Sequence, residues 1–214
     1  SYWKGAIPQD RLVDVARELR KTLWNLQAEA GIDLVPVGDF SLYDGMLDAV
    51  AMVGAVPERF DWNGDHVALD TYFRMARGDD DAVAMEMTKW FDTNYHYIVP
   101  EFTPGQTFRV ATSRLVEHVG EAVALGHAAK AVLPGPMTFL HLGKETQPGF
   151  DRWQHLDAVV SVYEALLAQI RADAAWIQLD EPILALDLPP ETLERFAGVY
   201  ERLRNKVMAD LVLE

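Results

Sequence analysis

Three short segments place polar side chains directly after apolar runs that have the composition of buried strands. They are residues 38–41 (GDFS), 100–103 (PEFT) and 180–182 (DEP). In a parallel α/β sheet the loops that follow the strands meet along one edge, and ligands bind there. Helix capping explains any one of these carboxylates equally well. The three together favour a binding site at that edge, with Asp180 and Glu181 among its candidates, but they indicate no particular reaction.

A fourth segment, residues 87–97 (MTKWFDTNYHY), gathers a cation, an amide, an imidazole and several aromatic rings. A lysine beside aromatic side chains could bind an anionic ligand through Lys89, with Asn94 and His96 as further hydrogen-bond partners. The alternative is a solvated lysine next to two aromatic residues that face the core. Composition alone favours this second interpretation.

Several kinds of chemistry are excluded by residue type. The chain has no cysteine, which excludes disulfides, thiolate metal sites and cysteine nucleophiles. Its six histidines lack the spacing of metal ligands, so no metal site is predicted. Phosphate-binding loops, dinucleotide fingerprints and the serine-nucleophile motif are absent.

The overall composition is that of a folded, acidic protein. A net charge of −14 argues against a nucleic-acid partner, because phosphate contacts need basic surface. No apolar run approaches the ~20 residues that cross a bilayer, so no membrane partner is predicted. Without a signal-peptide pattern either, the prediction is a cytoplasmic protein.

Hydrophobic periodicity predicts alternating helices and strands in a single domain. Helices are expected from Pro8 to Ala30, over 42–53, 114–125 and 156–170, and from Pro189 onward, with strands over 32–37, 95–102, 129–133 and 176–179. The first helix carries an amphipathic stripe, which typically faces the core: Leu12, Ala16, Leu19, Leu23, Leu26 and Ala30. Residues 57–81 are predicted to be a surface excursion with short helical turns, and no strand is assigned to residues 205–214. The order predicts an α/β fold with about four parallel strands.

Three longer strings resemble one enzyme family. Residues 31–48 (GIDLVPVGDFSLYDGMLD), 86–102 (EMTKWFDTNYHYIVPEF) and 176–184 (WIQLDEPIL) are similar to the N-terminal domain of cobalamin-independent methionine synthase. The family is also named 5-methyltetrahydropteroyltriglutamate–homocysteine methyltransferase. The similarity runs in order from about Tyr2 to about Arg202, which is nearly the whole chain.

The resemblance implies a partial (β/α)8 (TIM) barrel. Family members consist of two face-to-face barrels, so residues 1–214 would form an incomplete N-terminal barrel domain with about four of its eight strands. The first strand, the last strands and the catalytic C-terminal barrel would be absent. The chain would then begin inside the first helix of the family, at residues 1–5.

The resemblance also implies a function for the parent enzyme. That enzyme would move a methyl group from 5-methyltetrahydrofolate polyglutamate to homocysteine and make methionine, with zinc and without cobalamin. Because the zinc ligands and the homocysteine pocket belong to the second barrel, this chain should hold no catalytic residue and be inactive alone. Lys89 corresponds to the family's folate-tail lysine, whereas no family role transfers to Asn94, His96, Asp180 or Glu181.

Two other functions remain open from the residues alone. One is a barrel glycoside hydrolase that uses Glu101 and Glu181 as its paired carboxylates. The other is a non-catalytic interaction module, which would have no cleft at the strand ends.

An incomplete barrel has a consequence for the sheet. Its inner face would lack an opposite wall, so the apolar side chains expected there should be exposed and the chain should self-associate. These side chains are Val35, Val37, Ile98, Val132 and Ile177.

Overall fold

A computed structural model describes residues 2–207 and 210–214 of the chain. Its main feature is a four-stranded, wholly parallel sheet in the order β1-β5-β7-β8. The strands are β1 (Val35–Val37), β5 (Ala129–Pro134), β7 (Trp176–Asp180) and β8 (Leu211–Leu213). Within the described residues β8 does not pair with β1, so the sheet is open. The predicted α/β fold with four parallel strands is therefore confirmed.

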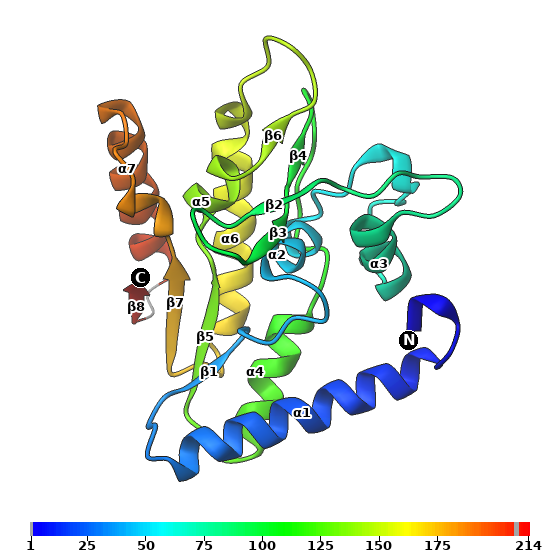
Figure 1. Cartoon of the computed structure of the whole chain (residues 1–214). Helices are drawn as coiled ribbons and strands as arrows, with labels where there is room; N and C mark the ends of the chain where they lie inside the picture. The colour runs from blue at the N-terminus through cyan, green and yellow to red at the C-terminus, as the bar shows by residue number, and fades with distance from the viewer. Residues whose placement is uncertain (1, 208–209) are drawn as a thin grey trace.

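Helices surround this sheet, and two small sheets lie apart from it (Figure 1). The α-helices are α1 (Gln9–Glu29), α2 (Gly45–Val53), α3 (Leu69–Arg77), α4 (Arg114–Ala124), α5 (Pro136–His141), α6 (Leu156–Ile170) and α7 (Pro190–Val207). The short 3₁₀ helices are η1 (Tyr2–Lys4), η2 (Glu58–Phe60), η3 (Arg152–His155) and η4 (Pro182–Ala185). The small sheets pair β2 (Met87–Lys89) with β3 (His96–Ile98), antiparallel, and β4 (Glu101–Phe102) with β6 (Lys144–Glu145), parallel. None of the described helices is long and apolar enough to cross a membrane.

One predicted member of the parallel sheet lies elsewhere. Residues 95–102 divide into β3 and β4, which belong to the two small sheets. Pro100 separates them, and a proline has no N–H with which to continue a strand ladder. The fourth strand of the main sheet is instead β8, where no strand was predicted, because three apolar residues are too short to show a period.

The buried face of the main sheet is the one that packs against the helices. Val35, Val37 and Ile177 lie on that face, and Ile98 of β3 is also buried, so the expectation that these four side chains are exposed is wrong. Successive side chains of a strand alternate between faces, and a shift of one residue exchanges the two sets. The opposite face is more polar, and of the five expected side chains only Val132 lies on it, partly exposed. Its other members include Lys130, Pro134, Gln178 and Asp180.

Helix α1 has the predicted bounds, but the face that it presents to the core is rotated away from the predicted stripe, and only Ala16 of that stripe is fully buried. Its buried residues are Ala16, Arg20 and Trp24, and the Trp24 indole N–H donates to the carbonyl oxygen of Pro36 at 3.1 Å. Leu19 and Leu26 of the predicted core stripe are exposed, Leu26 to 61%. The apolar stripe did not predict the buried face, because α1 packs against the core through Ala16, the indole of Trp24 and the guanidinium of Arg20.

Two further expectations near the N-terminus are wrong. Residues 57–81 are not a surface excursion, because Tyr72, Phe73 and Met75 of α3 are part of the hydrophobic core. Residues 2–4 do not lie inside the first α-helix, which begins at Gln9. They form η1, which packs on α3 through a hydrogen bond from the Tyr2 hydroxyl to Asp70.

A matched pair of substitutions tests the assignment of the two sheet faces. Val37→Ala should lower the free energy of unfolding by about 2 kcal/mol, because it removes two buried methyl groups and leaves a cavity. Val132→Ala, on the other face, should cost less than half as much, since its side chain is partly exposed. Urea unfolding followed by circular dichroism measures both. Equal losses would contradict the assignment.

Candidate functional site

Three of the predicted site residues lie together on the β2–β3 hairpin. The antiparallel register places Lys89 opposite His96, and Asn94 lies in the connecting turn. The His96 ring nitrogen Nδ1 is 3.0 Å from the Asn94 carbonyl oxygen. All three side chains are exposed. The hairpin therefore offers a cation, an amide and an imidazole on one accessible element.

Aromatic packing fixes the hairpin below this polar group. The Trp90 ring meets the rings of Phe91, Tyr95 and Tyr97 edge-on, with centroids 5.3, 6.5 and 5.6 Å away. Trp90 and Phe91 are partly buried against the core. Lys89 is thus a solvated lysine beside core-facing aromatic residues, and within residues 2–207 and 210–214 its ammonium forms no ion pair. This is the arrangement of the second interpretation, a solvated lysine next to aromatic residues that face the core. Its exposed ammonium can still bind a ligand.

The buried carboxylate of Asp44 anchors the hairpin to the rest of the domain. Its Oδ2 accepts hydrogen bonds from the backbone N–H groups of Leu47 (2.8 Å) and Ile98 (3.0 Å), and its Oδ1 accepts one from the Tyr95 hydroxyl (2.7 Å). Burial and the bond to Asp44 raise the pKa of Tyr95 to about 12. Asp44 is not among the predicted site residues, although an aspartate just before an apolar helix is a recognisable N-cap.

Glu181, at the carboxyl end of β7, is held by backbone and hydroxyl donors. Its side chain accepts from the N–H groups of Met137 (3.0 Å) and Thr138 (2.6 Å), at the start of α5, and from the Tyr200 hydroxyl (2.6 Å). Burial raises its pKa, an effect that these bonds only partly oppose. Gly135 must be glycine here, because a Cβ atom would overlap the Glu181 carboxylate. Glu181 therefore joins β7, α5 and α7.

Its neighbour Asp180 lies apart from the hairpin group. The half-buried carboxylate accepts a hydrogen bond from the Gln178 amide at 2.8 Å, within β7 itself. Burial raises the pKa of Asp180. Asp180 and Glu181 thus share a strand end, whereas Lys89, Asn94 and His96 share a hairpin.

Glu101 is also engaged in structure. Both of its oxygens accept from the Arg59 guanidinium, at 2.6 and 2.9 Å, and Lys144 Nζ is 3.8 Å from Oε1. A glycoside hydrolase needs one free acid and one free base or nucleophile. Because Glu101 and Glu181 are both held by structural partners, the glycoside hydrolase alternative has no support.

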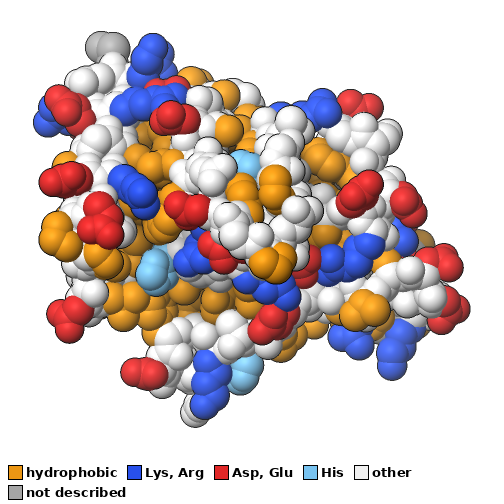
Figure 2. Space-filling model, turned by 90° about the horizontal axis from the view of Figure 1, so that it is seen from above, with side chains coloured by type: hydrophobic (Ala, Val, Ile, Leu, Met, Phe, Trp, Pro, Cys, Tyr) orange, Lys and Arg blue, Asp and Glu red, His pale blue; other side chains and the backbone are white. Residues whose placement is uncertain are grey.

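The loop after β1 opens onto a cavity. Gly38, Phe40 and Leu42 line it together with α1, α2, α4 and the end of β5, and its volume is about 300 Å³. This concave site at the strand ends departs from the cleft-free surface expected of a bare interaction module. Apolar side chains also gather on the face seen from above, interspersed with acidic and basic groups (Figure 2).

A metal does not fit the residues that the structure describes. Residues 2–207 and 210–214 contain no group of three or more His, Cys, Asp or Glu side chains that could hold an ion. The zinc that the resemblance implies for the parent enzyme would need ligands from outside these residues.

Comparisons with known proteins are consistent with one another. Residues 1–214 match the family model described as the N-terminal domain of cobalamin-independent synthase. A 5-methyltetrahydropteroyltriglutamate–homocysteine methyltransferase from Syntrophotalea carbinolica is 64% identical over 206 residues, covering 95% of this chain and 27% of that protein. The enzymes of the same name from Nitrosomonas europaea and Pasteurella multocida are 52% and 46% identical, covering 96% and 99% of this chain and 27% and 28% of their own.

A solved structure shares the fold. A B12-independent methionine synthase from a Shewanella species superposes with a TM-score of 0.69 at 17% identity, over 97% of this chain and 53% of that one. The chain thus spans about a quarter of the length of the curated relatives that it matches.

A substitution at Glu181 tests its structural role. Glu181→Gln removes the charge and turns an amide N–H₂ toward a backbone donor, so the free energy of unfolding should fall by roughly 2–3 kcal/mol. Asp180→Asn, on the half-buried neighbour, is the control and should cost less than 1 kcal/mol. Chemical denaturation measures both. A Glu181→Gln variant as stable as the unmodified chain would contradict a structural role for the Glu181 carboxylate at the start of α5.

Proposed function

The chain belongs to the cobalamin-independent synthase family, as part of its N-terminal domain, and we propose on this premise that it is a section of a methyltransferase. The parent enzyme transfers the methyl group of 5-methyltetrahydropteroyltriglutamate to homocysteine, which yields methionine. The names of the relatives support both substrates, and the family description excludes cobalamin. The parent works in the cytoplasm, with neither nucleic acid nor membrane as its partner.

The methyl transfer itself belongs to the part of the parent outside these residues. A zinc ion there supplies the activation of the homocysteine thiol, because a bound metal ion favours the thiolate. The present chain is inactive alone and contributes to donor binding and structural support.

Within the chain we assign binding of the folate polyglutamate tail to the β2–β3 hairpin, with Lys89 as the main contact. The observation that carries this assignment is an exposed ammonium without an ion-pair partner among the described residues, on a hairpin anchored by Asp44. A protein of net charge −14 repels a polyanionic ligand at long range, so a local cation is needed to hold one. Asn94 and His96 lie on the same hairpin and can add hydrogen bonds to the tail carboxylates.

The tail assignment is tested with the full-length parent enzyme. A charge-assisted hydrogen bond contributes roughly 1.5–3 kcal/mol, which corresponds to about a 10- to 100-fold change in affinity. Lys89→Ala should therefore raise KM for a polyglutamylated donor by at least about tenfold, with a much smaller effect for a monoglutamate donor and an unchanged kcat.

Lys21→Ala, on the exposed side of α1, is the matched control for loss of one surface charge. Lys89→Arg should retain most of the affinity, because it keeps the cation. Equal changes in KM for the polyglutamate and monoglutamate donors would show that Lys89 does not bind the polyglutamate tail.

We further propose that the isolated chain self-associates. Its support is the exposed row of Leu19, Leu23 and Leu26 on α1, together with the outer edges of β1 and β8, which pair with no other described strand. Exposed apolar stripes and free strand edges both favour contact with another chain.

Light scattering after size exclusion tests this self-association. The unmodified chain should elute as a species larger than 24.0 kDa, and Leu19→Lys/Leu26→Lys should shift it toward the monomer. Lysines are suitable because these positions are already exposed, so folding should be retained. A monodisperse monomer that unfolds cooperatively would contradict the proposal.

A further inference from the structure

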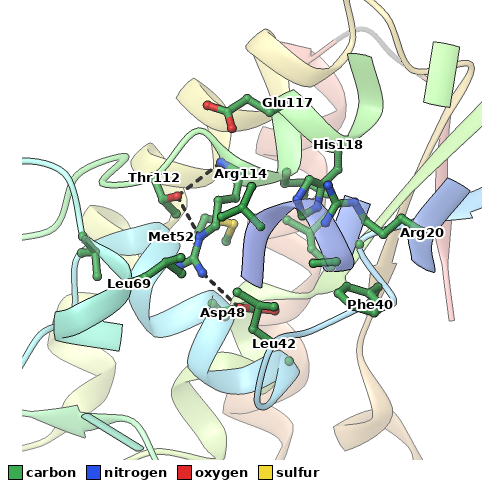
Figure 3. A pocket seen from close by; sticks show the side chains of 18 of the residues that line it. Arg20, Phe40, Leu42, Asp48, Met52, Leu69, Thr112, Arg114, Glu117 and His118 are labelled. Atoms are coloured by element: carbon green, nitrogen blue, oxygen red, sulfur yellow. Dashed lines mark hydrogen bonds and ion pairs between the residues drawn. The ribbon is translucent and has the colours of Figure 1, made fainter. Parts of the chain in front are cut away.

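The cavity after β1 has charged and apolar walls (Figure 3). Its lining comes from α1, the loop 38–42, α2, α4 and the end of β5, with His66 and Val67 from the segment before α3 and Leu69 from the start of α3. None of the residues predicted to bind the folate tail lines it. A volume of about 300 Å³ is at the lower end for small-molecule sites.

One wall of the cavity is occupied by groups that satisfy one another. Arg20 donates to Glu121 at 3.1 and 2.5 Å, and Arg17 donates to the same carboxylate at 3.3 Å. His118 stands beside Arg20, and burial lowers its pKa to about 4, so its ring is neutral at pH 7. Glu117 accepts from the Ser113 hydroxyl. This wall closes the cavity but leaves little unused charge for a ligand.

The other wall carries a carboxylate and a guanidinium with unused hydrogen-bonding capacity. Arg114 Nη1 is 3.9 Å from Asp48 Oδ1, an ion pair beyond hydrogen-bond length. Only Nε of the Arg114 side chain makes a hydrogen bond within the described residues, to the Thr112 hydroxyl at 3.2 Å. Its Nη2 is shielded from solvent and has no partner there, although the guanidinium lies over the Tyr72 ring at 4.6 Å.

The side chains of Asp48 and Arg114 are both partly exposed. The Asp48 side chain is 34% exposed and that of Arg114 20%, so both can be reached from the cavity without being open to bulk solvent. Burial raises the pKa of Asp48, an effect that Arg114 and the nearby hydroxyl groups of Ser41 and Tyr72 only partly offset. A hydrogen-bond donor on a ligand would therefore stabilise the charged form of Asp48, which the protein's own groups stabilise only in part.

The lining around these two groups is mostly apolar. Leu42, Met52, Leu69 and Leu115 line the cavity around Asp48 and Arg114, and Phe40 lies on its far side beside Arg20. Such walls exclude water and favour burial of an apolar group. Polar recognition is thus confined to one end of the cavity.

We propose that this cavity binds a free α-amino acid with an apolar side chain. Its ammonium would donate to Asp48, its carboxylate would accept from Nη1 of Arg114, which faces Asp48, and its side chain would lie among the leucines and Met52. A simple anion would meet the Asp48 carboxylate, and a simple cation would meet Arg114. A zwitterion complements both, because its two charges are adjacent, as those of the protein are. This site is independent of the tail contact at Lys89.

Calorimetric titration of the unmodified chain tests the ligand class directly. L-Leucine and L-methionine are titrated first, followed by N-acetyl-L-leucine, which lacks the ammonium, and L-leucinamide, which lacks the carboxylate. Saturable binding of both free amino acids is expected, with a loss of about tenfold or more for each blocked analogue. Blocked analogues that bind within a factor of about three of L-leucine would overturn the proposal, as would no binding of either amino acid at about 10 mM.

Substitutions locate the binding. Asp48→Asn and Arg114→Gln should each weaken L-leucine by about tenfold or more, whereas Asp157→Asn, a fully solvated carboxylate on α6, should not. Lys89→Ala should leave the cavity affinity unchanged, so failure of the tail assignment and failure of this one are distinguishable. If either cavity variant unfolds by circular dichroism, the analogue series on the unmodified chain decides alone. Binding that survives both substitutions in folded protein would place the amino acid elsewhere and contradict the inference.

Discussion

The position of the β2–β3 hairpin depends on one buried carboxylate, that of Asp44. A two-stranded hairpin is at best marginally stable by itself, and this one has only three paired positions. Asp44 ends the loop after β1 and begins α2, so its bonds to Ile98 and Tyr95 attach the hairpin to the layer that covers the main sheet. Bonds to an ionised acceptor are about twice as strong as neutral ones. The exposed cation at Lys89 therefore has a defined place because a carboxylate more than forty residues earlier in the chain is buried and fully bonded.

Glu181 uses the same physical device at the other end of the sheet. A buried carboxylate is costly unless donors surround it, and both Asp44 and Glu181 obtain these donors from a helix N-terminus and a tyrosine hydroxyl. Asp48 differs from both. It lies one helical turn after Asp44 but faces the cavity, and its closest cation is beyond hydrogen-bond length. Asp44 and Glu181 are fully bonded and have structural roles. Asp48 is incompletely bonded and can therefore receive a ligand.

Local sequence patterns predicted much of the fold. They failed for elements that are defined by the strand or helix with which they pair. Helix α6 and strands β5 and β7 lie within one residue of the predicted bounds, since each has a strong period or a continuous apolar run. Strand β8 and the division of residues 95–102 could not be predicted, because three-residue strands are defined by the neighbour that they pair with. The Lys89 hairpin was predicted as a chemical group, but its anchor at Asp44 was not. The cavity at Asp48 and Arg114 joins α2 to α4 across 66 positions, a proximity that no local pattern contains.

The alternation of the strands also explains how a quarter-length chain can have a core of its own. Had Val35, Val37 and Ile177 faced the interior of an incomplete barrel, the open sheet would have exposed them at ~25 cal/mol per Å² of apolar surface. They instead face the helices, and the other face of the sheet carries polar side chains: the partly exposed Lys130 and Asp180, and the buried Gln178. The exposed apolar side chains include a row on α1, outside the sheet: Leu19, Leu23 and Leu26. The open sheet therefore leaves Val35, Val37 and Ile177 covered, whereas the exposed leucines of the first long helix remain available for contact with further protein.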